Sequence, residues 1–127
     1  EPAKVCFIAN DFLESTLQTN PSFTNGFLHF YSDELQRSER RLRDLVHMNV
    51  RGRVALALLE IAEFFGTAPD KFIAVPIMRQ DIASYAGTTY ETVFKLMTDF
   101  TQNKIITTDG KRIRILKPGA LKAFIKK

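Results

Sequence analysis

The side chains of this sequence that could do chemistry gather in one stretch, GTTYETVFKLM, residues 87–97. Glu91 and Lys95 lie four residues apart and would share one face of a helix. Tyr90 and Phe94 would project on the same outward side. A carboxylate, an ammonium group and two aromatic rings can hydrogen-bond to a partner and stack on it, but they supply no nucleophile with an adjacent base. The stretch therefore indicates binding rather than catalysis.

The rest of the chain adds no catalytic or metal-binding motif. His29 and His47 are far apart and have no carboxylate or cysteine at ligand spacing, so we expect surface or interface histidines. Cys6 is the only cysteine, which excludes an internal disulfide, and its place on an apolar stretch predicts a core position. We expect no enzyme and no cofactor held by this chain. A catalytic role would need reactive groups from outside this sequence.

Composition places the chain among globular proteins of one domain, or one small domain with an appendage. It has 127 residues and an apolar share of 45%, which argues against disorder. No apolar run approaches the roughly 18–20 residues of a membrane span, and no signal peptide is evident. These features predict a cytoplasmic protein. The sequence begins at Glu1 without Met, so we expect a piece of a longer protein.

Positive charge is concentrated in the C-terminal part. The net charge is +4, yet residues 1–48 hold five Lys or Arg against seven acids, whereas residues 79–127 hold ten against four. A polyanion would bind most favourably to this second part. The alternative is a basic face that only aids solubility.

The apolar pattern and the turn residues predict a mainly helical chain with a small β-hairpin. A short strand over 4–10 has no partner strand in the sequence, and a short helix over 11–21, capped by Asn10 or Asp11, ends before Pro21. The elements that follow are a long helix to Met48, a helix over 50–66, a strand over 72–77, a helix over 78–87, a third helix over 89–102, a hairpin over 104–116 turning at Asp109-Gly110, and a final short helix.

The long helix carries an apolar seam that repeats in steps of three and four. Its members are Leu28, Tyr31, Leu35, Ser38, Leu42 and Leu45. A second row of phenylalanines suits packing on a neighbouring domain. Because both sides of the helix are apolar, the seam predicts pairing of two chains. A single amphipathic helix inside a monomer is the alternative.

Helix, short strand, helix, glycine turn, helix and basic hairpin is the element order of a winged helix-turn-helix. In such a domain the third helix lies in the DNA major groove, with its first residues on base edges. Lys111, Arg112 and Arg114 of the hairpin would attract phosphates whatever the sequence.

The runs RVALALLEIAEFFG and VPIMRQDIASYAGTTYETVFKLMTDFTQNKIITTDGKRIRIL resemble the Crp/Fnr family of bacterial transcription regulators. The resemblance extends over nearly the whole chain. It implies that residues 1–10 hold the last strand of a mostly missing β-roll effector domain. Residues 11–48 would then hold the short helix and the dimerisation helix, and residues 49–127 the winged helix-turn-helix domain. It also implies a homodimer on palindromic DNA, contact with RNA polymerase, and an effector that the sequence does not name.

Carried over position by position, the resemblance implies a DNA-binding set. Glu91 would accept a hydrogen bond from a cytosine amino group, Lys95 would reach guanine or phosphate, and Arg79 with Gln80 would contact phosphate. The full set is Arg79, Gln80, Thr89, Tyr90, Glu91, Phe94, Lys95, Lys111 and Arg112. The alternative for Glu91 and Lys95 is an i,i+4 pair that only stabilises the helix. Thr89 can cap the helix and also touch phosphate, and these two roles are compatible.

Several positions depart from the family pattern. Tyr90 stands where many members have a guanine-reading arginine, and Phe94 where small or polar residues are common, so Phe94 would press on thymine methyls or pack on the adjacent turn. Met78 replaces a capping Ser or Thr. Ser38 and Glu39 stand where cyclic-nucleotide sensors have two hydroxyls. We therefore expect a different half-site, and a protein-interaction module remains the alternative function.

Overall fold

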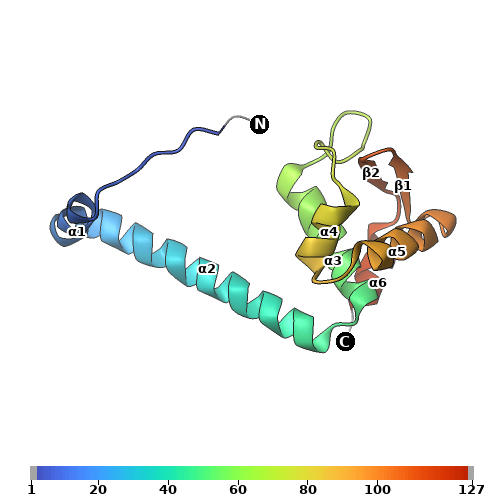
Figure 1. Cartoon of the computed structure of the whole chain (residues 1–127), viewed down its shortest axis with the longest axis horizontal. Helices are drawn as coiled ribbons and strands as arrows, with labels where there is room; N and C mark the ends of the chain where they lie inside the picture. The colour runs from blue at the N-terminus through green and yellow to red at the C-terminus, as the bar shows by residue number, and fades with distance from the viewer. Residues whose placement is uncertain (1–2, 126–127) are drawn as a thin grey trace. The chain divides into compact units, whose positions relative to one another are not determined.

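The computed structural model describes residues 3–125, and within them it is mainly helical with one two-stranded antiparallel sheet (Figure 1). This confirms the fold class predicted from the sequence. The chain divides into two units, one that ends at Arg41 and one that begins at Leu42. Each unit is described by itself. None of the helices in the described residues is long and apolar enough to span a membrane.

The first unit starts with an extended segment and helix α1, Asn10–Thr19. The strand predicted over 4–10 is not formed, because an extended segment needs a neighbouring strand for its backbone hydrogen bonds and none pairs with it here. Cys6 is exposed, so its predicted core position is wrong for this structure. The N-cap of α1 is Ala9, which has no capping side chain, rather than Asn10 or Asp11.

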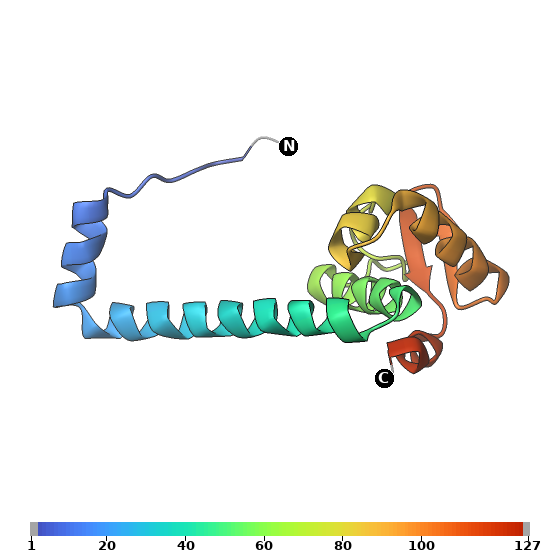
Figure 2. The ribbon, with the colours of Figure 1, turned by 60° about the horizontal axis from the view of Figure 1, so that its bottom comes forward.

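Helix α2, Pro21–His47, confirms the long helix. The Asn20 side chain accepts a hydrogen bond from the Phe23 N–H at 3.0 Å and so closes the first turn. Pro21 is the first helical residue, where its missing N–H costs no hydrogen bond. The chain turns sharply between α1 and α2 (Figure 2).

The predicted seam of α2 is solvent-exposed in the single chain. Its apolar side chains are exposed at Leu28 60%, Tyr31 57%, Leu35 64%, Leu42 64% and Leu45 46%, and Ser38 is also exposed. The phenylalanine row beside it is partly stacked on itself, with Phe23 and Phe27 ring centroids 5.9 Å apart. A row of large apolar side chains in water is unfavourable, so this face needs a partner surface.

The second unit is built on helix α3, Val50–Phe65, which agrees with the helix predicted over 50–66. The Asn49 side chain accepts a hydrogen bond from the Gly52 N–H at 2.9 Å, and Gly66 ends the helix. Val54 and Leu58 are fully buried, as the apolar pattern predicts. Phe65 continues the same apolar spacing, but at the end of the helix it is 47% exposed.

The strand predicted over 72–77 is an extended segment with only an isolated bridge at Ile73. It donates two backbone hydrogen bonds to the hairpin, from Ile73 to the Ile113 carbonyl at 2.8 Å and from Ile77 to the Lys111 carbonyl at 2.9 Å. Pro76 has no N–H, so the segment cannot continue as a regular ladder.

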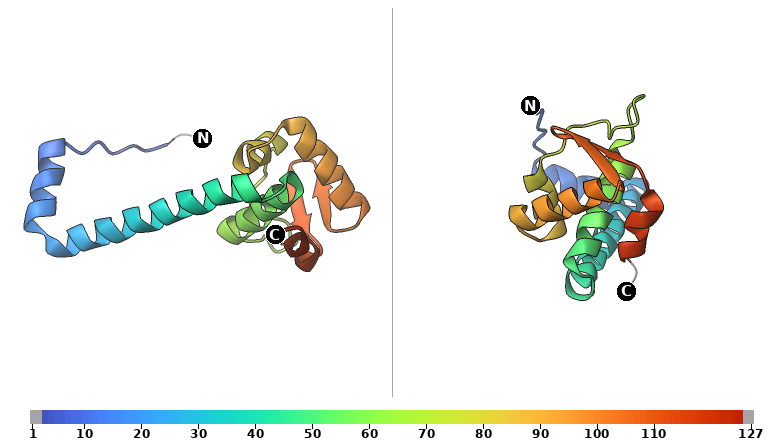
Figure 3. Two further views of the ribbon diagram at one scale, coloured as in Figure 1. Left: turned by 90° about the horizontal axis from the view of Figure 1, so that it is seen from below. Right: turned by 90° about the vertical axis from the view of Figure 1, so that its right-hand side faces the viewer.

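The remaining elements are α4, Arg79–Ala86; α5, Tyr90–Gln102; β1, Ile106–Asp109; β2, Arg112–Ile115; and α6, Pro118–Ile125. Helix α3 packs against α4 and α6, and α5 packs against α4 and β1 (Figure 3). The two strands pair from Ile106↔Ile115 to Asp109↔Arg112. The loop residues are therefore Gly110 and Lys111, one position later than the predicted Asp109-Gly110 turn, with Gly110 at φ 58°.

Candidate nucleic-acid interface

The turn between α4 and α5 depends on Gly87, which has a left-handed conformation with φ 60° and ψ 51°. An ideal Cβ built on Gly87 would lie 2.5 Å from the Leu45 Cδ2, so a side chain has no room there. Ile82 and Val93 are fully buried beneath the turn. This packing holds the inner faces of both helices and leaves the opposite face of α5 in solvent.

Arg53 holds the same turn from below, a role that the sequence analysis missed. Its guanidinium donates hydrogen bonds to the carbonyls of Ala86 at 2.9 Å, Gly87 at 3.2 Å and Met48 at 2.8 Å. An arginine directly before the apolar run of α3 that starts at Val54 has to find acceptors when the helix packs, and this was the signal available in the sequence. The turn before α5 is therefore fixed to the segment that joins α2 and α3.

Thr89 caps α5, as one of its two predicted roles requires. Its hydroxyl oxygen accepts a hydrogen bond from the Thr92 N–H at 3.3 Å and lies 3.0 Å from the Thr92 hydroxyl. The backbone at Thr89 is extended, with φ −90° and ψ 157°. The cap starts the helix so that the side chains directly after it stand at its exposed N-terminal end.

That end of α5 presents the predicted set together. Tyr90 is 42% and Phe94 49% exposed, with ring centroids 6.4 Å apart in a stacked arrangement. Glu91 and Lys95 are exposed, and within the described residues no ion pair joins them. The interpretation of these two as a helix-stabilising pair thus lacks a contact here. Both charges are free to meet a partner.

Arg79 and Gln80 open α4 beside this face. Gln80 is exposed, and Arg79 is half-buried with its guanidinium carbon 5.6 Å from the centre of the Phe94 ring. The expected lack of a side-chain cap at Met78 is confirmed. In its place the Asp81 carboxylate accepts a hydrogen bond from the Met78 N–H at 3.3 Å.

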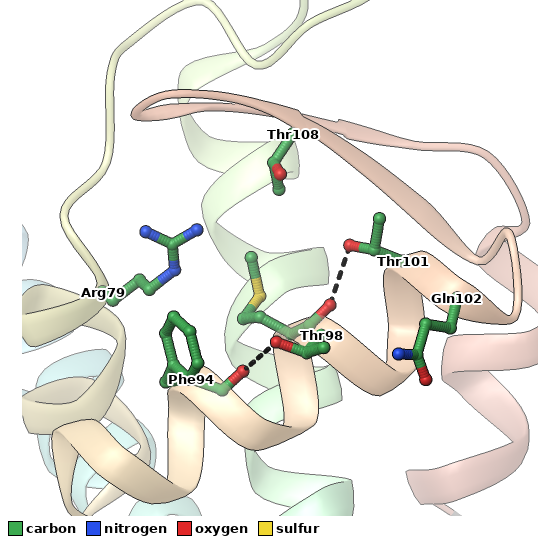
Figure 4. Close-up of a pocket in the computed structure, with 7 residues that line it drawn as sticks. Arg79, Phe94, Thr98, Thr101, Gln102 and Thr108 are labelled. Atoms are coloured by element: carbon green, nitrogen blue, oxygen red, sulfur yellow. Dashed lines mark hydrogen bonds between the residues drawn. The ribbon is translucent and has the colours of Figure 1, made fainter.

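An open pocket of about 300 Å³ lies between α4, α5 and β1 (Figure 4). It is lined by Arg79, Phe94, Met97, Thr98, Thr101, Gln102 and Thr108. The hydroxyls of Thr98 and Thr101 donate to carbonyls of their own helix, at 2.9 Å and 2.8 Å. Their hydroxyl hydrogens are therefore already used in hydrogen bonds. The charged side chain in the pocket lining is Arg79.

The hairpin presents its predicted basic residues unequally. Lys111 is exposed in the loop, whereas Arg112 donates to the Asp70 carboxylate and lies 4.5 Å from the Phe72 ring centre. The hydrogen bond from Arg112, followed by that from the Phe72 N–H, holds the pKa of Asp70 below its usual range. Arg112 is thus partly neutralised inside the chain. Asp70 was not predicted from the sequence as the partner of Arg112.

The histidines and the cysteine assemble no site. His29 and His47 are exposed, and the described residues contain no group of three or more His, Cys, Asp or Glu that could hold a metal ion. The exposed, charged and aromatic face of α5 is therefore the site with the most chemistry in this part of the chain.

Comparison with known proteins agrees with this geometry. A family profile described as the Crp-like helix-turn-helix domain matches residues 52–124, more than half of the chain. The chain belongs to the Crp/Fnr family. It is accordingly a member of a family of transcription regulators with a DNA-binding helix-turn-helix.

Two curated Crp/Fnr relatives illustrate the extent of the match. A CRP-like cAMP-activated global transcriptional regulator of Mycobacterium tuberculosis is 33% identical over 107 residues, which covers 83% of this chain and 48% of that protein. The global nitrogen regulator of Synechococcus elongatus is 29% identical over 122 residues, covering 94% and 55%. The chain thus spans about half the length of the curated relatives it matches.

Solved structures of Crp/Fnr proteins share the fold. FixK2 from Bradyrhizobium japonicum has a TM-score of 0.82 at 23% identity, covering 94% of this chain and 60% of that one. A CRP/FNR family regulator from Thermus thermophilus has a TM-score of 0.77 at 22% identity, covering 85% and 56%. At this identity the likeness establishes the winged helix architecture.

Proposed function

We propose that this chain is the dimerising and DNA-reading part of an effector-controlled transcription regulator that binds a palindromic DNA site. The observation that carries the proposal is the exposed end of α5, where Glu91 and Lys95 are unpaired beside two aromatic rings. Helix α5 follows the Gly87 turn and lies next to a basic hairpin. Such a helix can enter the DNA major groove with its first residues on base edges.

Six residues of this interface have the following proposed roles. Glu91 accepts a hydrogen bond from a cytosine amino group, and Lys95 donates to guanine or phosphate. Gln80, Thr89 and Lys111 contact the DNA backbone, which adds affinity without sequence preference. Tyr90 replaces the bidentate guanine contact of an arginine with an aromatic surface.

The dimer follows from the exposed seam of α2. Two copies pairing along it would place two α5 helices about one helical turn of DNA apart, roughly 34 Å. Residues 1–10 would complete a β-roll effector domain, where the extended segment at residues 3–9 gains partner strands. Effector binding would shift an existing equilibrium of the DNA-binding domains about the segment His47–Arg51. RNA polymerase is the proposed partner on the promoter.

The proposal is tested by selecting bound duplexes from a random DNA pool with the full-length protein at two salt concentrations. A palindrome should be enriched, and affinity should fall as salt rises. If no sequence is enriched and binding ignores salt, the stacked pair of Tyr90 and Phe94 becomes the anchor of a protein-interaction module instead.

The role of Glu91 is tested on the selected site. Glu91→Ala should relax the choice at one base pair by the roughly 1–3 kcal/mol of a good base contact and leave other positions unchanged. Lys111→Ala should weaken binding to all DNA sequences alike and lower the salt dependence of the affinity. An unchanged base preference in Glu91→Ala would refute its base contact.

A further inference from the structure

Three arginines of this unit lie over phenylalanine rings, but they differ in their other contacts. Arg51 lies over Phe100 and Phe124 and also pairs with the Asp99 carboxylate at 2.8 Å. Arg112 lies over Phe72 and also donates to the Asp70 carboxylate. Arg79 lies over Phe94, and among the described residues it has no acidic partner. The Arg79 Nε is buried and has no hydrogen-bond acceptor there either. The ring is thus the one group in the described structure that holds this guanidinium.

The two kinds of support have different electrostatic consequences. A carboxylate holds an arginine and cancels its charge, whereas an aromatic ring attracts the cation through its quadrupole and leaves the charge in place. Arg79 therefore keeps its full charge for an anion, while Arg112 shares its charge with Asp70. The phosphate backbone of DNA is the anion that the adjacent α5 face would bring near.

The geometry places the ring between two helices. Phe94 projects from α5 beneath Arg79, the first residue of α4, as Figure 4 shows. The Tyr90 ring lies beside the Phe94 ring in a stacked arrangement, with centroids 6.4 Å apart. The neighbouring threonine hydroxyls donate to their own helix, so they do not compete for a ligand of the guanidinium.

We propose that Phe94 is a positioning residue for Arg79, holding its guanidinium towards a DNA backbone phosphate. This inference rests on the proposed function and sharpens it. Phe94 then adds affinity that is independent of base sequence, and it does not select a thymine methyl. Arg79 is then a stronger phosphate anchor than Arg112, although both were predicted as backbone contacts.

The test is a double-mutant cycle with the full-length protein on its selected duplex. Phe94→Leu keeps an apolar helix former but removes the ring, and it should lower affinity roughly two- to fivefold, the usual range for an exposed cation–π contact. Phe94→Tyr should recover most of this loss. In an Arg79→Gln background, Phe94→Leu should have little further effect. The salt slope should fall by about one in Arg79→Gln and by less in Arg112→Gln.

Phe65→Leu is the matched control, since Phe65 is 47% exposed on α3 and Phe94 is 49% exposed on α5. It should leave affinity unchanged. Independent effects of Arg79→Gln and Phe94→Leu would overturn the inference. So would a changed base preference in Phe94→Leu, or loss of affinity when one thymine is replaced by uracil in the wild-type complex. If the wild-type protein enriches no duplex, the proposed function itself fails.

Discussion

Gly87 permits the tight turn between α4 and α5 because the absence of a side chain has two effects at this position. It adopts φ 60°, where an L-residue is strained by about 1–2 kcal/mol, and it leaves space for Leu45. Gly110 has nearly the same φ of 58° but nothing within 4 Å of an added Cβ. Comparing Gly87 with Gly110 therefore distinguishes the cost of backbone strain from the cost of a steric clash.

We therefore expect Gly87→Ala to lower the free energy of unfolding more than Gly110→Ala, as measured by urea unfolding. Gly110→Ala should cost about 1–2 kcal/mol from strain alone. Adding Leu45→Ala should recover part of the excess loss in Gly87→Ala. Equal losses in the two single variants would show that Leu45 does not press on the turn.

Asp70 makes the free energy of unfolding of this unit depend on pH in the acid range. Its folded pKa lies below its ordinary value near 3.8, chiefly through the hydrogen bond from Arg112. The ionised form is thus favoured in the folded state, so its contribution is complete above that ordinary value and is lost as pH falls through the lowered folded pKa.

The measurement is an NMR titration of the Asp70 carboxyl. In Arg112→Gln its pKa should rise towards the ordinary value, whereas Lys111→Gln, which removes a neighbouring charge without this hydrogen bond, should change it little. Below about pH 4, unfolding of Asp70→Asn should also depend less on pH than that of the wild type. An Asp70 pKa insensitive to Arg112→Gln would contradict the contact.

At the scale of elements, the ends of the helices differ in how well they are capped. Helix α3 starts at the Asn49 cap and α5 at the Thr89 cap, but Met78 before α4 offers no side-chain acceptor. A good N-cap stabilises a helix by typically about 1 kcal/mol. A capping residue in place of Met78, which is 52% exposed, should therefore stabilise helix α4.

We expect Met78→Ser to raise the free energy of unfolding by roughly 0.5–1 kcal/mol, because serine can accept a hydrogen bond from the first turn. Met78→Ala is the control for removal of the methionine, and it should give no such gain. Thermal unfolding of the two variants measures the difference. A gain shared by both would assign it to the lost methionine side chain and not to a cap.

At the scale of the whole molecule, the exposed α2 seam is the proposed dimer interface. Leu35 is 64% exposed in the single chain, and the other seam positions except Ser38 are also large apolar side chains. Charge at this position would be buried in a paired helix and would oppose dimerisation.

Leu35→Lys should therefore shift sedimentation of the full-length protein from dimer to monomer and weaken binding to a palindromic duplex. Asp33→Lys introduces the same side chain on the same helix, two residues away and outside the seam. It should stay dimeric. A dimeric Leu35→Lys variant would place the dimer interface elsewhere.

The sequence by itself determined the helices, their order, the hairpin and the family, because caps, glycines and apolar periodicity act locally. Asn49, Gly66, Gly87 and Thr89 each end or begin a helix where predicted. The strand expected over 4–10 is not formed because a strand depends on partners that no local pattern supplies. The segment over 72–77 does bond to the hairpin, but Pro76 prevents a regular ladder.

Only the tertiary structure decided which charges are free. Arg112 and Asp70 are 42 positions apart, and Arg53 reaches carbonyls more than 30 positions away, so spacing could not reveal either contact. Arg79 meets Phe94 because the Gly87 turn brings α4 against α5. Packing therefore decides which side chains meet across a turn. It leaves Arg79 without an acidic partner in the described residues and pairs Arg112 with Asp70.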